Sequence, residues 1–474
     1  MEHQRSILGD AAIVQQPGRS TRHAGAPVEL RRPLRSSSRR VRITTAGSTM
    51  PDRSTTPSSP QGVARHGRLP RRGPARMLLA LVAGAMAVVL VSGVSVAAIA
   101  VRTATSGVQT VSLGNEDEVA GVDISAIQGG ANILLVGSDE RDDGSQVDAG
   151  EVDGIRNDVT ILAHLSADHT QLTAVSFPRD LMIDVPECVG DDGQVYPAED
   201  YVQFNTTLGR GGLSCTVKTV EGMTGLAIPY AGKITFDGVI EMSNAIGGVD
   251  VCVTRTIRDT DSGIDLAAGT HPLQGAEALA FLRTRHGVGD GSDIARISSQ
   301  QVFLSSMMRK IISGGTLGDV TTLYKLASAA LSNMTLSSTL NSPDTLVRLA
   351  LALKDIQPAG IVFVQYPVVD DPRDSNRVVE STTDAAALNA ALNADEKFTL
   401  GDDSAGRGSV ADGTAPVATT APAAPEATST PSAATSGSAA PADPAATAAP
   451  TTTLPSTITG QSAAEATCSV GSSR

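Results

Sequence analysis

The feature that most constrains this chain is an uncharged run of 25 residues near its N-terminus. The run extends from Met77 to Val101 and is bounded by Arg76 and Arg102. As an α-helix it would be roughly 37 Å long, against a hydrocarbon core of about 30 Å. A cleaved signal peptide is the alternative, but signal peptides have a shorter apolar region and a much shorter leader than 76 residues. We therefore predict one retained transmembrane helix over residues 77–101.

Charge is divided unevenly about this run. Residues 1–76 contain fifteen Arg, no Lys and four acidic residues, although the 474-residue chain has a formal net charge of −13. Because basic flanks stay in the cytoplasm, we expect a cytoplasmic N-terminus, an extracytoplasmic remainder and contact of the basic arm with membrane lipid. The acidic outer part, with only 3% aromatic residues, argues against nucleic acid as a partner of the folded domain.

Composition then divides the chain into five parts. We predict a disordered, Arg-rich cytoplasmic arm over residues 1–76, the transmembrane helix over 77–101 and a linker over 102–124. An extracytoplasmic folded domain is expected over residues 125–400. Ala, Pro and Thr dominate much of the sequence beyond residue 400, which predicts a disordered tail over residues 401–474.

Apolar periodicity within residues 125–400 predicts strands mixed with helices. Strands are expected at residues 131–137, 159–165, 172–177, 249–253 and 361–366. Helices are expected at residues 236–246, 274–282, 294–312, 319–333 and 343–354. Residues 214–222 form a polar periodic segment, which is expected to begin with a Ser cap. The pairs Gly211-Gly212 and Gly247-Gly248 are interpreted as turns. Such a mixture predicts an α/β protein whose sheet is covered by helices on both faces.

The four cysteines all follow the predicted membrane span, where disulfides persist. They are Cys188, Cys215, Cys252 and Cys468, and they allow three pairings. Cys188 with Cys215 is the best local pairing because these residues flank a loop rich in Gly, Asp and Pro. The remaining pairing stays open, and the spacing of Cys and His does not resemble a metal site.

Arginine and aspartate recur at the ends of the predicted elements. The residues concerned are Asp139, Arg156, Asp158, Arg179, Asp180, Arg283, Arg285, Asp293, Arg296 and Gln300. On a helix, Asp293, Arg296 and Gln300 would share one face. Solvated surface ion pairs are the simple interpretation of any one pair. The combination favours a pyrophosphate site, because Arg grips phosphate oxygens with two donors while carboxylates hold Mg²⁺.

Four segments that contain these residues resemble successive motifs of the LytR-CpsA-Psr family. They read NILLVGSDERDDG, RNDVTILAHLSADHTQLTAVSFPRDLMIDVP, FDGVIEMSNAIGGVDVCV and LQGAEALAFLRTRHGVGDGSDIARISSQQVFL. The resemblance covers about residues 130–312 in order. It implies a three-layer α-β-α sandwich around a mixed central sheet. The implied activity transfers a glycopolymer from a polyprenyl-pyrophosphate carrier to peptidoglycan through a phosphodiester.

The resemblance also implies roles for the charged residues. Asp139 and Asp158 would hold Mg²⁺, and Asp180 is a candidate general base. The expected catalytic residues are Asp158, Arg179, Asp180, Arg283 and Arg285, and the expected substrate-binding residues are Arg156, Asp293, Arg296 and Gln300. Candidates for an apolar tunnel that takes the prenyl chain are Phe236, Ile240, Phe303, Leu304 and Met307.

Two positions depart from the family pattern. Asn157 stands where a small hydroxyl residue or Ala is more usual, and Ser299 stands where a further Arg often precedes the paired glutamines. Two other functions use similar phosphate ligands: a polyprenyl-pyrophosphate pyrophosphatase, and a non-catalytic lipid-binding regulator of the envelope. The residues alone do not distinguish these three functions, and only the resemblance favours the transferase.

Overall fold

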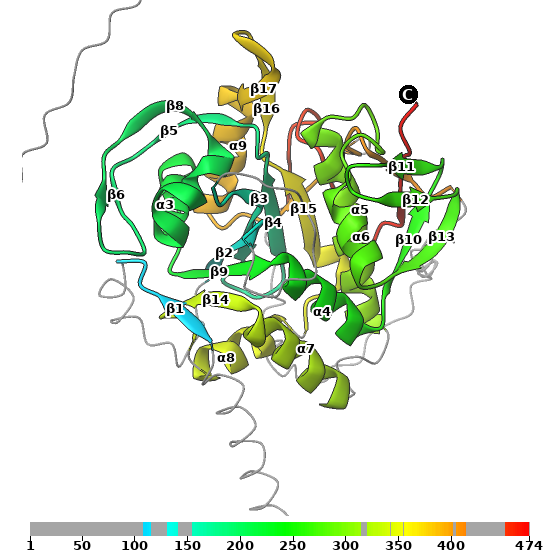
Figure 1. Cartoon of the computed structure of the whole chain (residues 1–474), viewed down its shortest axis with the longest axis horizontal. Helices are drawn as coiled ribbons and strands as arrows, with labels where there is room; N and C mark the ends of the chain where they lie inside the picture. The colour runs from blue at the N-terminus through cyan, green and yellow to red at the C-terminus, as the bar shows by residue number, and fades with distance from the viewer. Residues whose placement is uncertain are drawn as a thin grey trace, which may run out of the picture. The chain divides into compact units, whose positions relative to one another are not determined.

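The described residues form a mixed α/β fold with a central mixed sheet (Figure 1). The computed structural model describes residues 108–114, 130–140, 154–313, 320–341, 343–353, 355–401, 404–413 and 451–473. The predicted arm, the predicted transmembrane helix and most of the predicted linker lie outside these ranges. Among the residues described, none of the helices has both the length and the apolar composition that crossing a bilayer requires.

Eight strands build the central sheet in the order β1-β14-β9-β2-β3-β4-β15-β21. Their bounds in that order are Gln109–Val111, Met334–Ser337, Tyr230–Thr235, Ala131–Ser138, Asn157–Leu165, Leu172–Phe177, Ile361–Gln365 and Gly460–Ser462. β2 pairs antiparallel with β3 and parallel with β9, and β4 pairs antiparallel with β3 and parallel with β15. The strands expected at residues 131–137, 159–165, 172–177 and 361–366 are confirmed within two residues.

Each face of this sheet shares a core with helices. On one face, buried residues of β2, β3 and β4 such as Leu134, Leu162 and Val175 pack with α3 (Thr207–Thr224) and α9 (Thr382–Asn393). The other face packs with α8 (Pro343–Leu353) and with the C-terminal half of α6 (Asp293–Ser313). Because successive side chains of a strand point to opposite faces, the alternating apolar residues of β2 and β3 supply both cores.

A smaller sheet has the order β13-β10-β22-β19. Its strands are Gly269–Leu273, Val249–Val253, Thr467–Ser469 and Ser409–Ala411. It shares a core with α5 (Ala276–Arg283) and α6, and α6 also contacts β15 and β21 of the central sheet. Helix α6 therefore lies between the two sheets (Figure 1). The remaining helices are α4 (Phe236–Ile246) and α7 (Val320–Ser332), and all five predicted helices are confirmed within two residues.

The polar segment expected from residue 214 belongs to a longer helix, α3, which begins at Thr207. Gly211 and Gly212 interrupt it with non-helical backbone angles, so the turn expected there is a break within a helix. At the start of the second half, the Asp191 carboxylate accepts the backbone N–H groups of Leu213 and Ser214 at 2.8 and 2.9 Å. A Ser cap was therefore the wrong expectation, because a distant Asp satisfies these donors instead. The predicted Cys188–Cys215 disulfide is present beside this turn.

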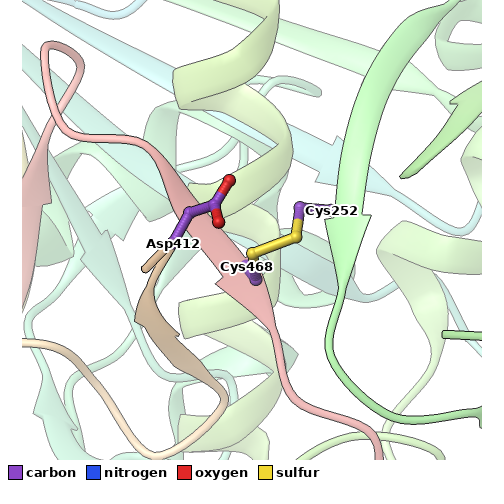
Figure 2. Close-up of side chains that lie close together, drawn as sticks. All are labelled: Cys252, Asp412 and Cys468. Carbon is purple, nitrogen blue, oxygen red and sulfur yellow. A yellow bond between two sulfur atoms is a disulfide. The ribbon is translucent and has the colours of Figure 1, made fainter. Parts of the chain in front are cut away.

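The expectation of a disordered tail over residues 401–474 is wrong for residues 404–413 and 451–473. Residues 460–462 form β21 on the edge of the central sheet, and residues 467–469 form β22 between β10 and β19. A disulfide joins Cys252 on β10 to Cys468 on β22, close to Asp412 (Figure 2). Arg309 on α6 donates to the carbonyls of Ala463 and Glu465 at 3.1 and 2.8 Å. Composition missed these strands because they are short and are stabilised by distant partners.

Five two-stranded ribbons complete the described fold, pairing β5 with β8, β6 with β7, β11 with β12, β16 with β17 and β18 with β20. The strands β5 to β8 are Met182–Val185, Cys188–Val189, Val195–Tyr196 and Glu199–Gln203. The strands β11 and β12 are Ile257–Asp259 and Ile264–Leu266. The strands β16, β17, β18 and β20 are Val368–Asp371, Asp374–Glu380, Phe398–Thr399 and Thr452–Thr453.

The two disulfides should contribute unequally to stability. Cys252–Cys468 closes a separation of 216 residues and Cys188–Cys215 one of 27, and longer loops lose more entropy in the unfolded chain. We expect the double substitution Cys252→Ala/Cys468→Ala to lower the free energy of unfolding by about 5 kcal/mol, and Cys188→Ala/Cys215→Ala by about 3.5 kcal/mol. Urea unfolding of the three proteins measures both values. An equal or larger cost for the shorter loop would contradict the expectation.

Candidate active site

The ends of three adjacent strands bring the predicted residues to one edge of the central sheet. Asp139 follows β2, Arg156 precedes β3 and Arg179 follows β4. Because β3 runs antiparallel to both neighbours, its beginning lies beside their ends. The backbone N–H of Arg156 donates to the Asp139 carboxylate at 2.7 Å, which ties the first two segments together.

A β-bulge sets the position of Asp158. Ser138 on β2 pairs with Asn157 and Gly137 pairs with Val159, so Asp158 has no partner opposite it on β2. Such bulges redirect one side chain out of the regular alternation. The neighbouring Asn157 is buried, and its side-chain amide oxygen accepts the backbone N–H of Leu208 in α3 at 3.3 Å. The departure from the family pattern at residue 157 therefore links β3 to the first turn of α3.

Asp180, which follows the end of β4, is contacted by several cationic side chains. The Asp180 side chain is 7% exposed, and its carboxylate accepts the guanidinium of Arg285 at 2.7 Å and the Gln203 amide at 2.6 Å. The guanidinium of Arg377 lies 3.5 Å from it, and Nε of Arg179 lies 3.7 Å away. Both oxygens of Asp180 are thus already engaged by donors.

Helix α6 adds the second buried pair. Asp293 and Arg296, one turn apart, form an ion pair of 2.5 Å, and both side chains are 5% exposed. Asp293 also accepts the backbone N–H of Arg179 at 2.9 Å, and Arg296 donates to the carbonyl of Asp158 at 2.9 Å. Burial raises the pKa of Asp293 while the Arg296 guanidinium opposes that rise. The start of α6 is therefore joined to the ends of β3 and β4.

The charged side chains at the strand ends and at the start of α6 surround one end of a cavity of about 330 Å³. Its polar lining consists of Asp158, Arg179, Arg283, Arg285, Arg296, Gln300 and Ser243. The rest is apolar apart from Gly137: Leu135, Val159, Ile161, Ile234, Phe236, Val239, Met242, Leu279, Leu282, Phe303, Leu304 and Met307. Along α6 the lining changes from Arg296 and Gln300 to apolar residues, and Met307 lies roughly 16 Å from Arg296 along the helix axis. The cavity is thus charged at one end and apolar along the rest of its length.

The apolar candidates largely line this cavity as expected. Four of the five candidates belong to the lining: Phe236, Phe303, Leu304 and Met307. Ile240 is not part of the lining in the portion of the chain that the structure describes. Helix α4 presents its face there because the Thr235 side chain accepts the N–H of Gly238 and fixes the first turn. The Arg283 guanidinium lies 4.7 Å from the centre of the Phe236 ring, a cation–π contact at the boundary between the two zones.

Asp139 and Arg156 lie beside the cavity and are not part of its described lining. Burial, reinforced by the charge of Asp158, raises the pKa of Asp139. The carboxylates of Asp139 and Asp158 are therefore close enough to repel each other electrostatically. Asp139, Asp158, Arg179, Asp180, Arg283, Arg285, Asp293, Arg296 and Gln300 thus meet around one region, as expected from the sequence.

Sequence reasoning missed Gln203 and Arg377, which both approach Asp180. Each lies on a short strand with no motif around it, and only the tertiary fold brings them to the site. Ser299 faces away from the cavity, because its hydroxyl lies 2.7 Å from that of Ser469 on β22. At position 299, where an arginine is more usual in the family, this chain therefore has a serine that contacts the C-terminal segment.

Comparison with known proteins identifies the family of this chain. Residues 97–395 match the LytR_cpsA_psr family model. The chain is 28% identical over 274 residues to the cell wall biosynthesis protein LcpA of Corynebacterium glutamicum, covering 52% of this chain and 51% of LcpA. It is 30% identical over 185 residues to the polyisoprenyl-teichoic acid–peptidoglycan teichoic acid transferase TagT of Bacillus subtilis, covering 38% of this chain and 52% of TagT.

The chain spans about half the length of these curated relatives. Among solved structures, a LytR-Csp2A-Psr enzyme from Actinomyces oris matches with a TM-score of 0.43 and 23% identity, covering 56% of this chain and 90% of that chain. The family match covers more than half of the sequence and contains all ten of the charged and polar residues identified from it. The chain therefore belongs to the LytR-CpsA-Psr family.

Proposed function

We propose that this protein transfers a glycopolymer from a polyprenyl-pyrophosphate carrier to peptidoglycan during cell-wall assembly. The observation that carries the proposal is a single cavity whose charged end continues into an apolar interior. A lipid pyrophosphate has the same two parts in the same order. Relatives named as cell wall biosynthesis proteins and teichoic acid–peptidoglycan transferases support the same class of reaction.

The apolar interior suits the prenyl chain. Leu135, Ile161 and Phe303 lie among its lining residues, and Phe303 is buried. Transfer of apolar surface from water to such a lining contributes about 25 cal/mol per Å². The lipid would therefore bind with its chain between the sheet, α4 and α6, which leaves its pyrophosphate at the charged end.

The arginines suit the pyrophosphate. Arg179, Arg283 and Arg285 line the cavity, and planar guanidinium groups bind phosphate oxygens with two parallel hydrogen bonds. Asp180 lies beside the guanidinium groups of Arg179 and Arg285, so the donors of these two arginines are oriented before substrate arrives. Asp293 accepts the backbone N–H of Arg179 and fixes its main chain. Asp180 already accepts bonds at both oxygens, which suits a carboxylate that orients arginines better than one that takes a proton.

The residues present also fit a magnesium ion. Asp139 and Asp158 offer the hard oxygen ligands that Mg²⁺ prefers, and the raised pKa of Asp139 indicates that its negative charge lacks full compensation. A bound cation would relieve that electrostatic cost and neutralise charge on the pyrophosphate in the transition state. Asp139 and Asp158 are therefore our proposed metal ligands.

The reaction exchanges a phosphoanhydride bond for a phosphoester bond. A muramyl hydroxyl oxygen attacks the phosphorus that carries the glycan, and the bond from that phosphorus to the bridging oxygen breaks. The hydroxyl proton is released to solvent, and the products are a glycan phosphodiester on peptidoglycan and a polyprenyl monophosphate. The pyrophosphate is already activated, so this chain's task is to orient the reactants and compensate charge.

The proposed setting is the outer face of a cell membrane. In our proposal the catalytic part is an α-β-α sandwich, anchored by one transmembrane helix over residues 77–101 with the N-terminus in the cytoplasm. The membrane would then supply the lipid-linked substrate, and the outer face would supply peptidoglycan. The apolar run, its flanking charges and the disulfides Cys188–Cys215 and Cys252–Cys468 support this setting.

Asp158→Ala should lower kcat/KM for transfer at least about a hundredfold, because it removes both a proposed metal ligand and the partner of Arg179. The assay supplies a polyprenyl-pyrophosphate glycan, a peptidoglycan oligomer and Mg²⁺, with product measured by mass spectrometry. Asp265→Ala is the matched control, because that carboxylate is 60% exposed on the β11–β12 ribbon. Free phosphorylated glycan as product would indicate a pyrophosphatase, and bound but unchanged lipid would indicate a carrier.

Arg283→Lys and Arg285→Lys should each lower kcat/KM about tenfold or more although the charge is retained, because Lys cannot form the paired hydrogen bonds. Arg258→Lys, at a residue whose side chain is 69% exposed, serves as the control. The same transfer assay applies to all three variants. Wild-type rates in both site variants would exclude bidentate binding by these arginines.

Membrane topology can be tested on whole cells. A protease added to spheroplasts should remove the folded part while an epitope before residue 77 stays protected, because the N-terminus is expected in the cytoplasm. The same epitope should become accessible after the membrane is dissolved. Degradation of the N-terminal epitope in intact spheroplasts would contradict the proposed orientation.

A further inference from the structure

Asp259 is a buried carboxylate outside the residues that the family resemblance assigns. It ends β11, and only 5% of the residue is exposed. Neither of its neighbours in sequence belongs to the charged cavity. A buried Asp without a cation beside it is costly unless several hydrogen bonds compensate its charge.

Four donors surround this carboxylate. One oxygen accepts the Thr284 hydroxyl at 2.7 Å and the backbone N–H groups of Arg285 and His286 at 3.1 and 3.2 Å. The other accepts the N–H of Asp261 at 3.0 Å. Burial opposes the charge, but the hydrogen bonds from Thr284, Asp261 and Arg285 outweigh it and lower the pKa of Asp259. The carboxylate is therefore ionised at neutral pH and fixes three consecutive residues, 284 to 286.

Those residues directly follow Arg283 and include Arg285, two arginines that line the cavity. Arg283 is the last residue of α5, Thr284 follows it with extended backbone angles, and Arg285 comes next. Arg283 and Arg285 both line the cavity, and Arg285 reaches Asp180 at 2.7 Å. The direction in which the chain leaves α5 therefore determines where the Arg285 guanidinium lies.

We propose that Asp259 is a positioning residue, which holds the segment 284–286 so that Arg285 points at the pyrophosphate end of the cavity. This inference rests on the proposed function, and it adds a residue that acts on the substrate only through Arg285. Asp261 and His286 lie near Asp259 and could suggest a cation site. Both oxygens of Asp259 already accept hydrogen bonds from the segment and from Asp261, which favours the positioning role.

The test measures binding of a polyprenyl pyrophosphate that carries no glycan to the full-length protein in detergent with Mg²⁺. Asp259→Asn should weaken binding about tenfold, because an amide cannot accept all of these donors and its NH₂ faces some of them. Asp265→Asn is the matched control on the same ribbon and should bind as the wild type does. Arg285→Ala and the double variant with Asp259→Asn complete a cycle.

The cycle distinguishes positioning from general destabilisation. If Asp259 acts through Arg285, Asp259→Asn should change binding less than about threefold once Arg285 is Ala. An equal loss in both backgrounds, or wild-type affinity in Asp259→Asn, would overturn the inference while leaving the proposed function intact. Failure of the wild-type protein to bind the lipid would reject both. If Asp259→Asn does not fold, Thr284→Val replaces it in the cycle, with a smaller loss expected in the same direction.

Discussion

Buried and half-buried carboxylates hold the arginines of this site together, and the rest of the arrangement depends on that pairing. Two guanidinium charges about 6 Å apart repel each other by about 3 kcal/mol at an effective dielectric constant of 20. Asp158 and Asp180 pair with Arg179 and Arg285, and Asp293 pairs with Arg296. The site therefore keeps a set of oriented donors facing one cavity, which is the condition for binding a pyrophosphate strongly without first rearranging.

The fold supplies this condition through long-range packing. The ends of β2 and β4 and the beginning of β3 lie at one sheet edge, and the bulge at Asp158 directs its side chain away from the regular pairing. Helix α6 reaches the same edge, since Asp293 binds the backbone of Arg179. Its other side contacts the C-terminal segment through Ser299 and Arg309. The last residues of the chain thus support the helix that carries Arg296 and Gln300.

Local sequence predicted the elements whose apolar pattern is strong, such as β4, β10 and α4, whose bounds match the expectation. It also identified the charged residues of the cavity, because each lies in a motif of the family. Short polar strands such as β21 and β22 could not be predicted, since their stability comes from β15, β10 and the Cys252–Cys468 bond. Arg377 and Asp259 were missed for the same reason: the contacts that link them to the site are with residues far away in sequence.

The central claim is that one cavity binds both parts of a lipid pyrophosphate. An experimental structure of the protein with a polyprenyl pyrophosphate and Mg²⁺ bound tests it most directly. We predict that the phosphates lie within hydrogen-bonding distance of Arg283 and Arg285, with prenyl carbons between Ile161 and Phe303. A lipid bound elsewhere, or a pyrophosphate that contacts none of the cavity's arginines, would contradict the account.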